Sequence, residues 1–197
     1  MGKQFVQLEP VHRDFIQRQH IFFTASVAEQ SRVNVSPKDG SSLRLLGPNA
    51  VAYMDRTGSG NETAAHLLAD GRLTLMFCAF EEPPLILRLY GQGRVLHRGS
   101  QEYLEMLTAA FNGLETPGAR HIIVLEIEMV QTSCGLGVPL FDFIEERHGL
   151  DRWAQSKGEE GLRQYRVQKN ARSIDGLPTG LPEAQGIPVQ EEVLLPK

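Results

Sequence analysis

The eight residues Leu73-Thr-Leu-Met-Phe-Cys-Ala-Phe80 are largely apolar on both faces of an extended chain. Such a run predicts a β-strand that is buried on both sides. A second long segment follows at residues 85–95, where Gly91 and Gly93 predict a bulge or a sharp bend. These two segments indicate that β-strands build the core of the protein.

Four more strands are predicted around these two, at residues 21–27, 32–36, 50–55 and 122–130. The strand at 32–36 alternates, so that its two valines share one face while Asn34 and Ser36 share the other. Residues 37–40, Pro-Lys-Asp-Gly, are typical of a turn. A short extra pairing is expected at residues 43–46.

Helices are predicted at residues 11–18, from Gly60 to about Asp70, and at residues 100–111. Six strands with few helices favour a mainly β protein with α decoration, in which the sheet forms a closed or partly closed barrel.

The composition changes after about residue 132, where glycine and proline become frequent. Residues 151–171 look helical, with interruptions near Gly158 and Gly161, and four prolines follow residue 176. We therefore expect a barrel domain at residues 1–132 and a helical arm at 133–180 that packs on the barrel or on a partner subunit. Residues 181–197 are expected to form a flexible tail.

The overall charge excludes some classes of partner. The 197 residues carry 20 basic and 24 acidic side chains, a net charge of −4, which does not suit a general nucleic-acid binder. Arg166, Lys169 and Arg172 could form a loose basic stripe, but interleaved acidic residues favour a solvated helix face. The N-terminus has no apolar signal core, and no apolar run is long enough to span a bilayer.

Cysteine and histidine usage argues against metal sites and disulfides. Cys78 and Cys134 are the two cysteines, and neither belongs to a CxxC pair. No two of the six histidines have the i, i+4 spacing of a helical zinc pair. We expect a reduced, cytoplasmic protein without a metal centre.

The glycine-rich stretch Arg56-Thr-Gly-Ser-Gly-Asn-Glu-Thr63 follows a strand and opens a helix. Ser59 and Glu62 have the spacing of a capping box, with Ser59 as the N-cap residue. Such a turn also exposes backbone N–H groups at the positive end of the helix dipole, where a phosphate can bind. An ordinary capped helix remains the alternative interpretation.

The polar strand face at residues 32–38 is a second candidate site. Arg32, Asn34 and Ser36 lie on one face, and Lys38 follows them. Such a face could hold a polyol chain and a phosphate. A solvated strand face followed by a turn is the alternative.

Several motifs resemble one known family, the pyridoxamine 5'-phosphate oxidase-like FMN-binding proteins. The resemblance covers about residues 10–180. The motifs at residues 133–139 and 169–178 resemble one branch of this family, the predicted flavin-nucleotide-binding proteins. The motifs are Thr57-Gly-Ser-Gly-Asn-Glu-Thr-Ala-Ala-His66, Asp70-Gly-Arg-Leu-Thr-Leu-Met-Phe-Cys-Ala-Phe80, Asn34-Val-Ser-Pro-Lys38, Leu87-Arg-Leu-Tyr-Gly-Gln-Gly-Arg94, Ser133-Cys-Gly-Leu-Gly-Val-Pro139 and Lys169-Asn-Ala-Arg-Ser-Ile-Asp-Gly-Leu-Pro178.

The resemblance implies a six-stranded split β-barrel and a homodimer with two FMN sites at the subunit interface. In this family the FMN phosphate is held by the second strand, the end of the third and the start of the next helix. Arg172 of the partner subunit is a further candidate. Carried over to this sequence, the remaining candidates are Arg32, Asn34, Ser36, Lys38, Asp55, Arg56, Thr57, Ser59, Gly60, Asn61, Glu62 and Thr63.

The sequence also departs from the family pattern. The start of the helix is basic in true pyridoxamine phosphate oxidases, whereas Asn61-Glu-Thr63 stands here, and the C-terminal Arg-x-His signature is not evident. These departures argue against oxidation of vitamin B6. The sequence therefore predicts an FMN-dependent oxidoreductase of unknown substrate. The alternatives are a non-catalytic protein that stores or senses a flavin, and a relative that binds a deazaflavin or haem.

Overall fold

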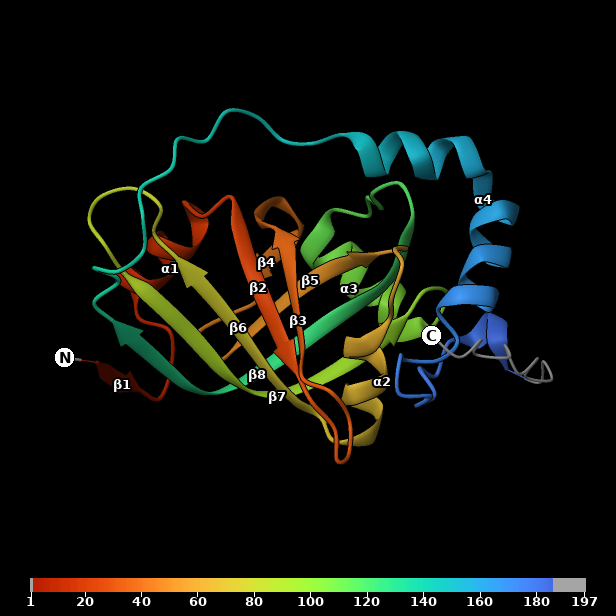
Figure 1. Ribbon diagram of the computed structural model, residues 1–197, viewed down its shortest axis with the longest axis horizontal. Coiled ribbons are helices and arrows are strands. Elements are labelled where there is room, and N and C mark those ends of the chain that lie inside the picture. The colour runs from red at the N-terminus through yellow and green to blue at the C-terminus, as the bar shows by residue number, and fades with distance from the viewer. Residues whose placement is uncertain (1, 186–197) are drawn as a thin grey trace, which may run out of the picture.

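The computed structural model describes residues 2–185, which form a curled antiparallel sheet with helices packed against it (Figure 1). The sheet order is β3-β2-β6-β7-β8-β5-β4, and β1 pairs with β8. The mainly β fold that the sequence predicts is confirmed. The strands are β1 (Lys3–Phe5), β2 (Ile21–Ser26), β3 (Asn34–Asp39), β4 (Leu43–Leu45), β5 (Ala50–Arg56), β6 (Arg72–Cys78), β7 (Ile86–His97) and β8 (Ala119–Ser133).

The helices within the described residues include two short 3₁₀ turns. Pro10 stands at the first position of α1, where its missing N–H costs nothing. Phe15 and Ile16 are buried, as the predicted orientation of this helix requires. The helical elements are α1 (Pro10–Gln17), η1 (Gly40–Ser42), α2 (Glu62–Ala69), α3 (Gln101–Phe111), α4 (Gly149–Lys169) and η2 (Pro182–Ala184).

The six predicted strands correspond to β2, β3, β5, β6, β7 and β8, and the expected short pairing is β4. Strand β1 was not predicted, because three residues are too few to show an alternating pattern. It is held in place by the far end of β8, where Phe5 lies opposite Val130.

The predicted turn at residues 37–40 is wrong. Pro37 lies inside β3, opposite Phe23 of β2, and the chain turns only at η1. Proline is tolerated here because β3 is an edge strand, whose outward side needs no N–H donor. Gly40 fixes the turn, since its N–H donates to the His20 carbonyl at 2.8 Å. A Cβ at Gly40 would lie 2.2 Å from the Gln19 carbonyl oxygen.

The bulge predicted in the long strand occurs at Gly91. The register between β7 and β8 shifts between Tyr90 and Gly91. A Cβ at Gly91 would lie 1.9 Å from the Glu126 carbonyl oxygen, so only glycine fits there. The bulge bends β7 and allows the sheet to curl.

Two apolar clusters lie on opposite faces of the sheet. The larger one lies inside the curl and includes Phe22, Tyr53 and Leu89. The smaller one lies under α3, where Tyr103 packs with Leu96 and other side chains from the outer face. The paired strands β5 and β8 contribute to both clusters, which explains their apolar sequences.

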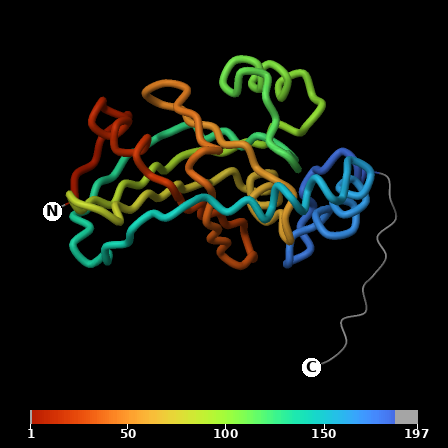
Figure 2. The backbone as a smooth tube through the Cα atoms, turned by 90° about the horizontal axis from the view of Figure 1, so that it is seen from above, coloured from red at the N-terminus to blue at the C-terminus, as the bar shows by residue number. Residues whose placement is uncertain are grey.

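After β8 the chain runs without helix or strand over residues 134–148, across the top of the view in Figure 1. Helix α4 then bends at Gly158, whose φ of 64° is left-handed, as the predicted interruption requires. The helix continues through Gly161. In Figure 2 the blue chain after α4 lies beside the yellow segment of α2. No helix within residues 2–185 is long and apolar enough to cross a membrane.

The predicted tail falls partly outside the described residues. Leu181 is buried and residues 182–184 form η2. Residues 186–197 lie outside the described part of the chain.

Candidate functional site

The two candidate segments of the sequence meet in the structure. Asn34 on β3 donates through Nδ2 to Thr63 Oγ1 in the first turn of α2, at 3.1 Å. Ser36 Oγ donates to Asn34 Oδ1, also at 3.1 Å, so both ends of the Asn34 amide are engaged. The polar face of β3 and the start of α2 therefore form one continuous polar surface.

A buried serine–histidine pair lies next to this surface. Asn34 Nδ2 is also 3.4 Å from Ser26 Oγ, which lies 3.0 Å from Nδ1 of His66 in α2. The His66 Nε2 atom has no hydrogen-bond partner within the described residues. Buried polar atoms are normally paired, so this nitrogen is available to a ligand or a solvent molecule.

At the far end of β3, Lys38 enters a buried charge cluster centred on Asp55. The Asp55 carboxylate lies 2.5 Å from Lys38 Nζ and 2.5 Å from Arg120 Nη2. His121 Nε2 lies 2.9 Å from the same carboxylate, because the pairing of β5 with β8 places the two residues opposite each other. Burial alone would raise the pKa of Asp55, but Lys38, Arg120 and His121 lower it well below its usual value.

His121 is fully buried between this cluster and His97 of β7. Burial lowers the pKa of His121 to about 4, against the opposing effect of the Asp55 carboxylate. The rings of His121 and His97 lie edge to face, with centroids 6.1 Å apart. His121 is therefore neutral at pH 7.

The predicted capping box at the start of α2 is wrong. The N-cap residue is Asn61, and its side chain makes no capping bond. Ser59 is exposed in the preceding loop. The Glu62 carboxylate accepts from the Ile174 N–H, with distances of 3.0 and 3.1 Å to its two oxygens. Glu62 therefore accepts a hydrogen bond from the backbone of Ile174 and not from the backbone of Ser59, as the capping box would require.

The C-terminal segment, residues 170–183, covers the loop before α2. Asn170 donates through Nδ2 to the Gly58 carbonyl at 2.9 Å, and Asn61 Nδ2 donates to the Asn170 carbonyl at 3.1 Å. Arg166 in α4 donates through Nε to Glu183 at 2.7 Å, and its Nη1 lies 3.4 Å from the buried Thr57 Oγ1. Residues of α4 and of the C-terminal segment in the same subunit therefore hold the loop before α2 in place.

Two of the predicted basic residues already pair with acidic residues further along the chain. Arg32 forms an ion pair with Asp175, whose carboxylate also accepts from the Arg32 backbone N–H at 2.7 Å. Arg56 forms an ion pair with Asp151 at the start of α4. Arg172 is exposed and donates to the Gly176 carbonyl of its own chain at 2.7 Å.

These pairings determine what the site can hold. Arg32, Lys38 and Arg56 each pair with a carboxylate, and Glu62 adds a negative charge at the helix start. Lys38 and Arg120 share the Asp55 carboxylate, so this buried cluster keeps one positive charge. Backbone N–H groups and hydroxyls of the Gly58-Ser59-Gly60 loop would supply the other contacts to an anion.

Sequence reasoning missed three residues of this network, Arg120, His121 and Asn170. Arg120 and His121 directly precede the apolar strand segment 122–130. Two polar residues at the start of a buried strand were the only sequence signal that could have marked them as site residues. Asn170 lies within the motif at residues 169–178 that resembles the family, but the resemblance assigned it no role. Its contacts with Gly58 and Asn61 join residues more than 100 positions apart.

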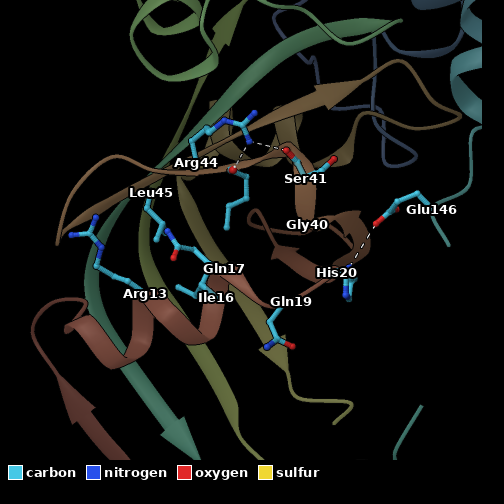
Figure 3. Close-up of a pocket in the computed structure, with 11 residues that line it drawn as sticks. Arg13, Ile16, Gln17, Gln19, His20, Gly40, Ser41, Arg44, Leu45 and Glu146 are labelled. Carbon is cyan, nitrogen blue, oxygen red and sulfur yellow. Dashed lines mark hydrogen bonds and ion pairs between the residues drawn. The ribbon is translucent and has the colours of Figure 1, made fainter. Parts of the chain in front are cut away.

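A cavity of about 490 Å³ lies elsewhere, between α1, η1 and β4 (Figure 3). Arg44 donates through Nη1 to the Ser41 carbonyl on its wall, at 2.7 Å. His20 lies 3.9 Å from Glu146 and stacks on Phe143, with ring centroids 3.7 Å apart. None of the candidate site residues lines this cavity. Residues 2–185 contain no cluster of three potential metal ligands.

Comparison with known proteins identifies the family. The family model described as pyridoxamine 5'-phosphate oxidase matches residues 8–134. The pyridoxamine 5'-phosphate oxidase family protein ustO of Aspergillus flavus is 40% identical over 185 residues, which covers 84% of this chain and 73% of that protein.

Two solved structures share the fold. A histidine-to-alanine variant of HupZ from Group A Streptococcus gives a TM-score of 0.51 at 19% identity, covering 64% of this chain and 98% of that one. A Lactobacillus delbrueckii protein, provisionally described as a pyridoxamine 5'-phosphate oxidase, gives 0.51 at 19% identity, covering 64% and 94%. The chain has the split-barrel fold and belongs to the pyridoxamine 5'-phosphate oxidase family.

Proposed function

We propose that this protein binds FMN on the polar surface formed by β3 and the start of α2, and that it is an FMN-dependent oxidoreductase. The hydrogen bond between Asn34 and Thr63 carries the proposal, because it joins the two segments to which the family resemblance assigns the cofactor. FMN, when bound, supplies hydride and electron transfer. The role of the protein is to bind, to orient and to limit access of water.

The residues proposed to hold FMN divide by chemistry. Side-chain amides and hydroxyls from Asn34, Ser36 and Thr63 suit the ribityl chain, which both donates and accepts hydrogen bonds. The loop backbone at residues 57–63 suits the phosphate. The remaining candidates are Arg32, Lys38, Asp55 and Arg56, with the partner's Arg172 as a further one. Arg32, Lys38 and Arg56 are already paired within the chain, so a partner's guanidinium would add an unpaired cation to the site.

The proposed FMN site predicts a charge-dependent effect at Ser59. Thr63 is buried and bonded to Asn34, so a substitution of Thr63 would disturb the fold. Ser59 is exposed, and a substitution of Ser59 should leave the fold intact. Ser59→Glu is expected to weaken FMN binding at least about fivefold, because a new carboxylate beside a phosphate costs about 1–4 kcal/mol. Fluorescence titration with FMN and with riboflavin, which has no phosphate, measures the effect.

Ser59→Gln is the matched control, since it has nearly the same size without the charge. It should bind FMN almost as the wild type does, and riboflavin should bind equally to all three proteins. Equal losses of FMN and riboflavin in the Glu variant would show that the phosphate lies elsewhere. A wild-type protein that binds neither ligand would overturn the flavin proposal itself.

Catalysis is tested separately from binding. Anaerobic addition of a reduced nicotinamide nucleotide to the FMN-loaded protein should bleach the flavin absorbance, and an electron acceptor should restore it. Stable oxidised flavin under these conditions, with every donor tried, would favour the non-catalytic alternative.

We also propose a homodimer, which is supported by apolar residues exposed on one subunit. Val35 of edge strand β3 and Val33, which directly precedes this strand, are 60% and 69% exposed. Apolar exposure of this kind marks an interaction surface. Further exposed apolar residues follow β8, namely Leu136, Leu140, Phe141, Phe143 and Ile144.

The dimer predicts a specific effect of charge on β3. Val35→Lys is expected to shift the protein from dimer to monomer in sedimentation velocity runs, because a charge would have to be buried in the interface. Val6→Lys, at another exposed valine, is the control and should leave the dimer intact. A monomeric wild type, or a dimeric Val35→Lys protein, would contradict this interface.

A further inference from the structure

Asn170 is the central contact between the C-terminal segment and the loop before α2. Its side chain is fully buried and engaged at both ends, since Nδ2 donates to the Gly58 carbonyl at 2.9 Å and Oδ1 accepts from Arg120 Nη1 at 2.8 Å. Its backbone carbonyl accepts from Thr179 Oγ1 at 2.7 Å and from Asn61 Nδ2 at 3.1 Å. One residue thus fixes the loop, Arg120 and the C-terminal segment together.

These contacts also fix the orientation of two peptide groups. The Gly58 carbonyl points to Asn170, and the Gly60 carbonyl accepts from Arg120 Nη1 at 3.0 Å. In a trans peptide the N–H points opposite to the carbonyl. The N–H groups of Ser59 and Asn61 therefore point away from Asn170 and Arg120. Backbone N–H groups at the start of a helix can bind an anion.

Two buried polar atoms at the start of α2 have no partner within the described residues. Asn61 Oδ1 and His66 Nε2 belong to side chains that are 2% and 1% exposed, and neither atom has a hydrogen-bond partner within the described residues. Such atoms are rare in folded proteins and are usually satisfied by water or a ligand. They occupy positions one residue before α2 and in its second turn.

We propose that Asn170 is a positioning residue for the cofactor phosphate, acting by holding the Gly58 and Gly60 peptides so that the next N–H groups face the ligand. The inference rests on the proposed FMN function. Arg120 alone holds the Gly60 peptide, but it also serves Asp55 and is itself oriented by Asn170. Glycine has the greatest backbone freedom of all residue types, so the peptides of Gly58 and Gly60 need the hydrogen bonds from Asn170 and Arg120 to keep their orientation.

Asn170→Ala tests the role without changing the charge. FMN affinity should fall at least tenfold, while riboflavin affinity changes less than threefold, because only the phosphate uses the oriented N–H groups. Thr179→Val is the matched control. It removes a hydroxyl bonded to the Asn170 carbonyl but touches no loop peptide, and should leave the ratio of the two affinities unchanged.

Amide hydrogen exchange of the wild type supplies a measurement that does not depend on a folded variant. Without ligand, the amide of exposed Ser59 should exchange quickly. FMN should slow its exchange at least tenfold, and riboflavin should not. An unchanged FMN-to-riboflavin ratio in folded Asn170→Ala, or equal protection by both ligands, overturns the inference. A wild type that binds no FMN overturns the proposed function, and this inference with it.

Discussion

Replacement of Asp55 by alanine is expected to lower the free energy of unfolding by about 3–5 kcal/mol, because it leaves buried cations without a counter-charge. The Asp55 side chain is 4% exposed and lies 2.5 Å from both Lys38 Nζ and Arg120 Nη2. Arg120 is also buried, so water cannot replace the missing carboxylate. Urea denaturation at pH 7 measures the change directly.

Asp151→Ala is the matched control, since it also removes a carboxylate paired with an arginine. The Asp151 and Arg56 side chains are 29% and 20% exposed, and ion pairs accessible to solvent contribute less than about 1 kcal/mol. Equal losses for the two variants would mean that burial does not strengthen the Asp55 cluster. Both variants must also keep the oligomeric state of the wild type, because a change of oligomeric state would alter stability for another reason.

The Asp55 cluster shows which part of the site the sequence could predict. Asp55 itself was predicted from the family resemblance, and the polar alternation on β3 placed Lys38 near the same site. His121 lies directly opposite Asp55 in the pairing of β8 with β5, and Arg120 lies where the register shifts by one residue between Asp55 and Arg56. Alternation within one strand shows neither which residue of another strand lies opposite nor where such a shift occurs, so it could not reveal these contacts.

The loop before α2 shows a different limit. Residues 59–62 match a local capping pattern, and the helix does begin there, at Glu62. However, Glu62 bonds to the Ile174 N–H and Asn170 bonds to the Gly58 carbonyl. These partners are 112 positions apart in the chain, and a sequence contains no rule that brings them together. Strands, helices and the Gly91 bulge were predictable because their signals are local.

The stability of the protein is expected to fall by about 3 kcal/mol between pH 6.5 and pH 4, owing to His121. Burial lowers the pKa of this histidine in the folded protein to about 4, from 6.5. Between these values the unfolded chain binds a proton that the folded protein does not, so acid favours unfolding. Burial also lowers the pKa values of His97 and His12, which adds to the loss in the same direction.

Urea denaturation at pH 7, 6, 5 and 4 tests this dependence, with His121→Gln as the comparison. Three charged or titratable groups face the His121 ring, namely Asp55, Arg120 and His97. Asp55 remains ionised over this range, because its pKa lies well below the usual value. The charge cluster therefore persists. Carboxylates whose pKa is lowered in the folded protein, such as Glu115 and Glu159, contribute to the slope only near pH 4–5, so the slope between pH 7 and pH 5 comes mainly from histidines. The Gln variant is less stable at pH 7, but its stability should depend more weakly on pH. An equal slope in both proteins would assign the proton uptake to His97, His12 and the carboxylates instead of His121.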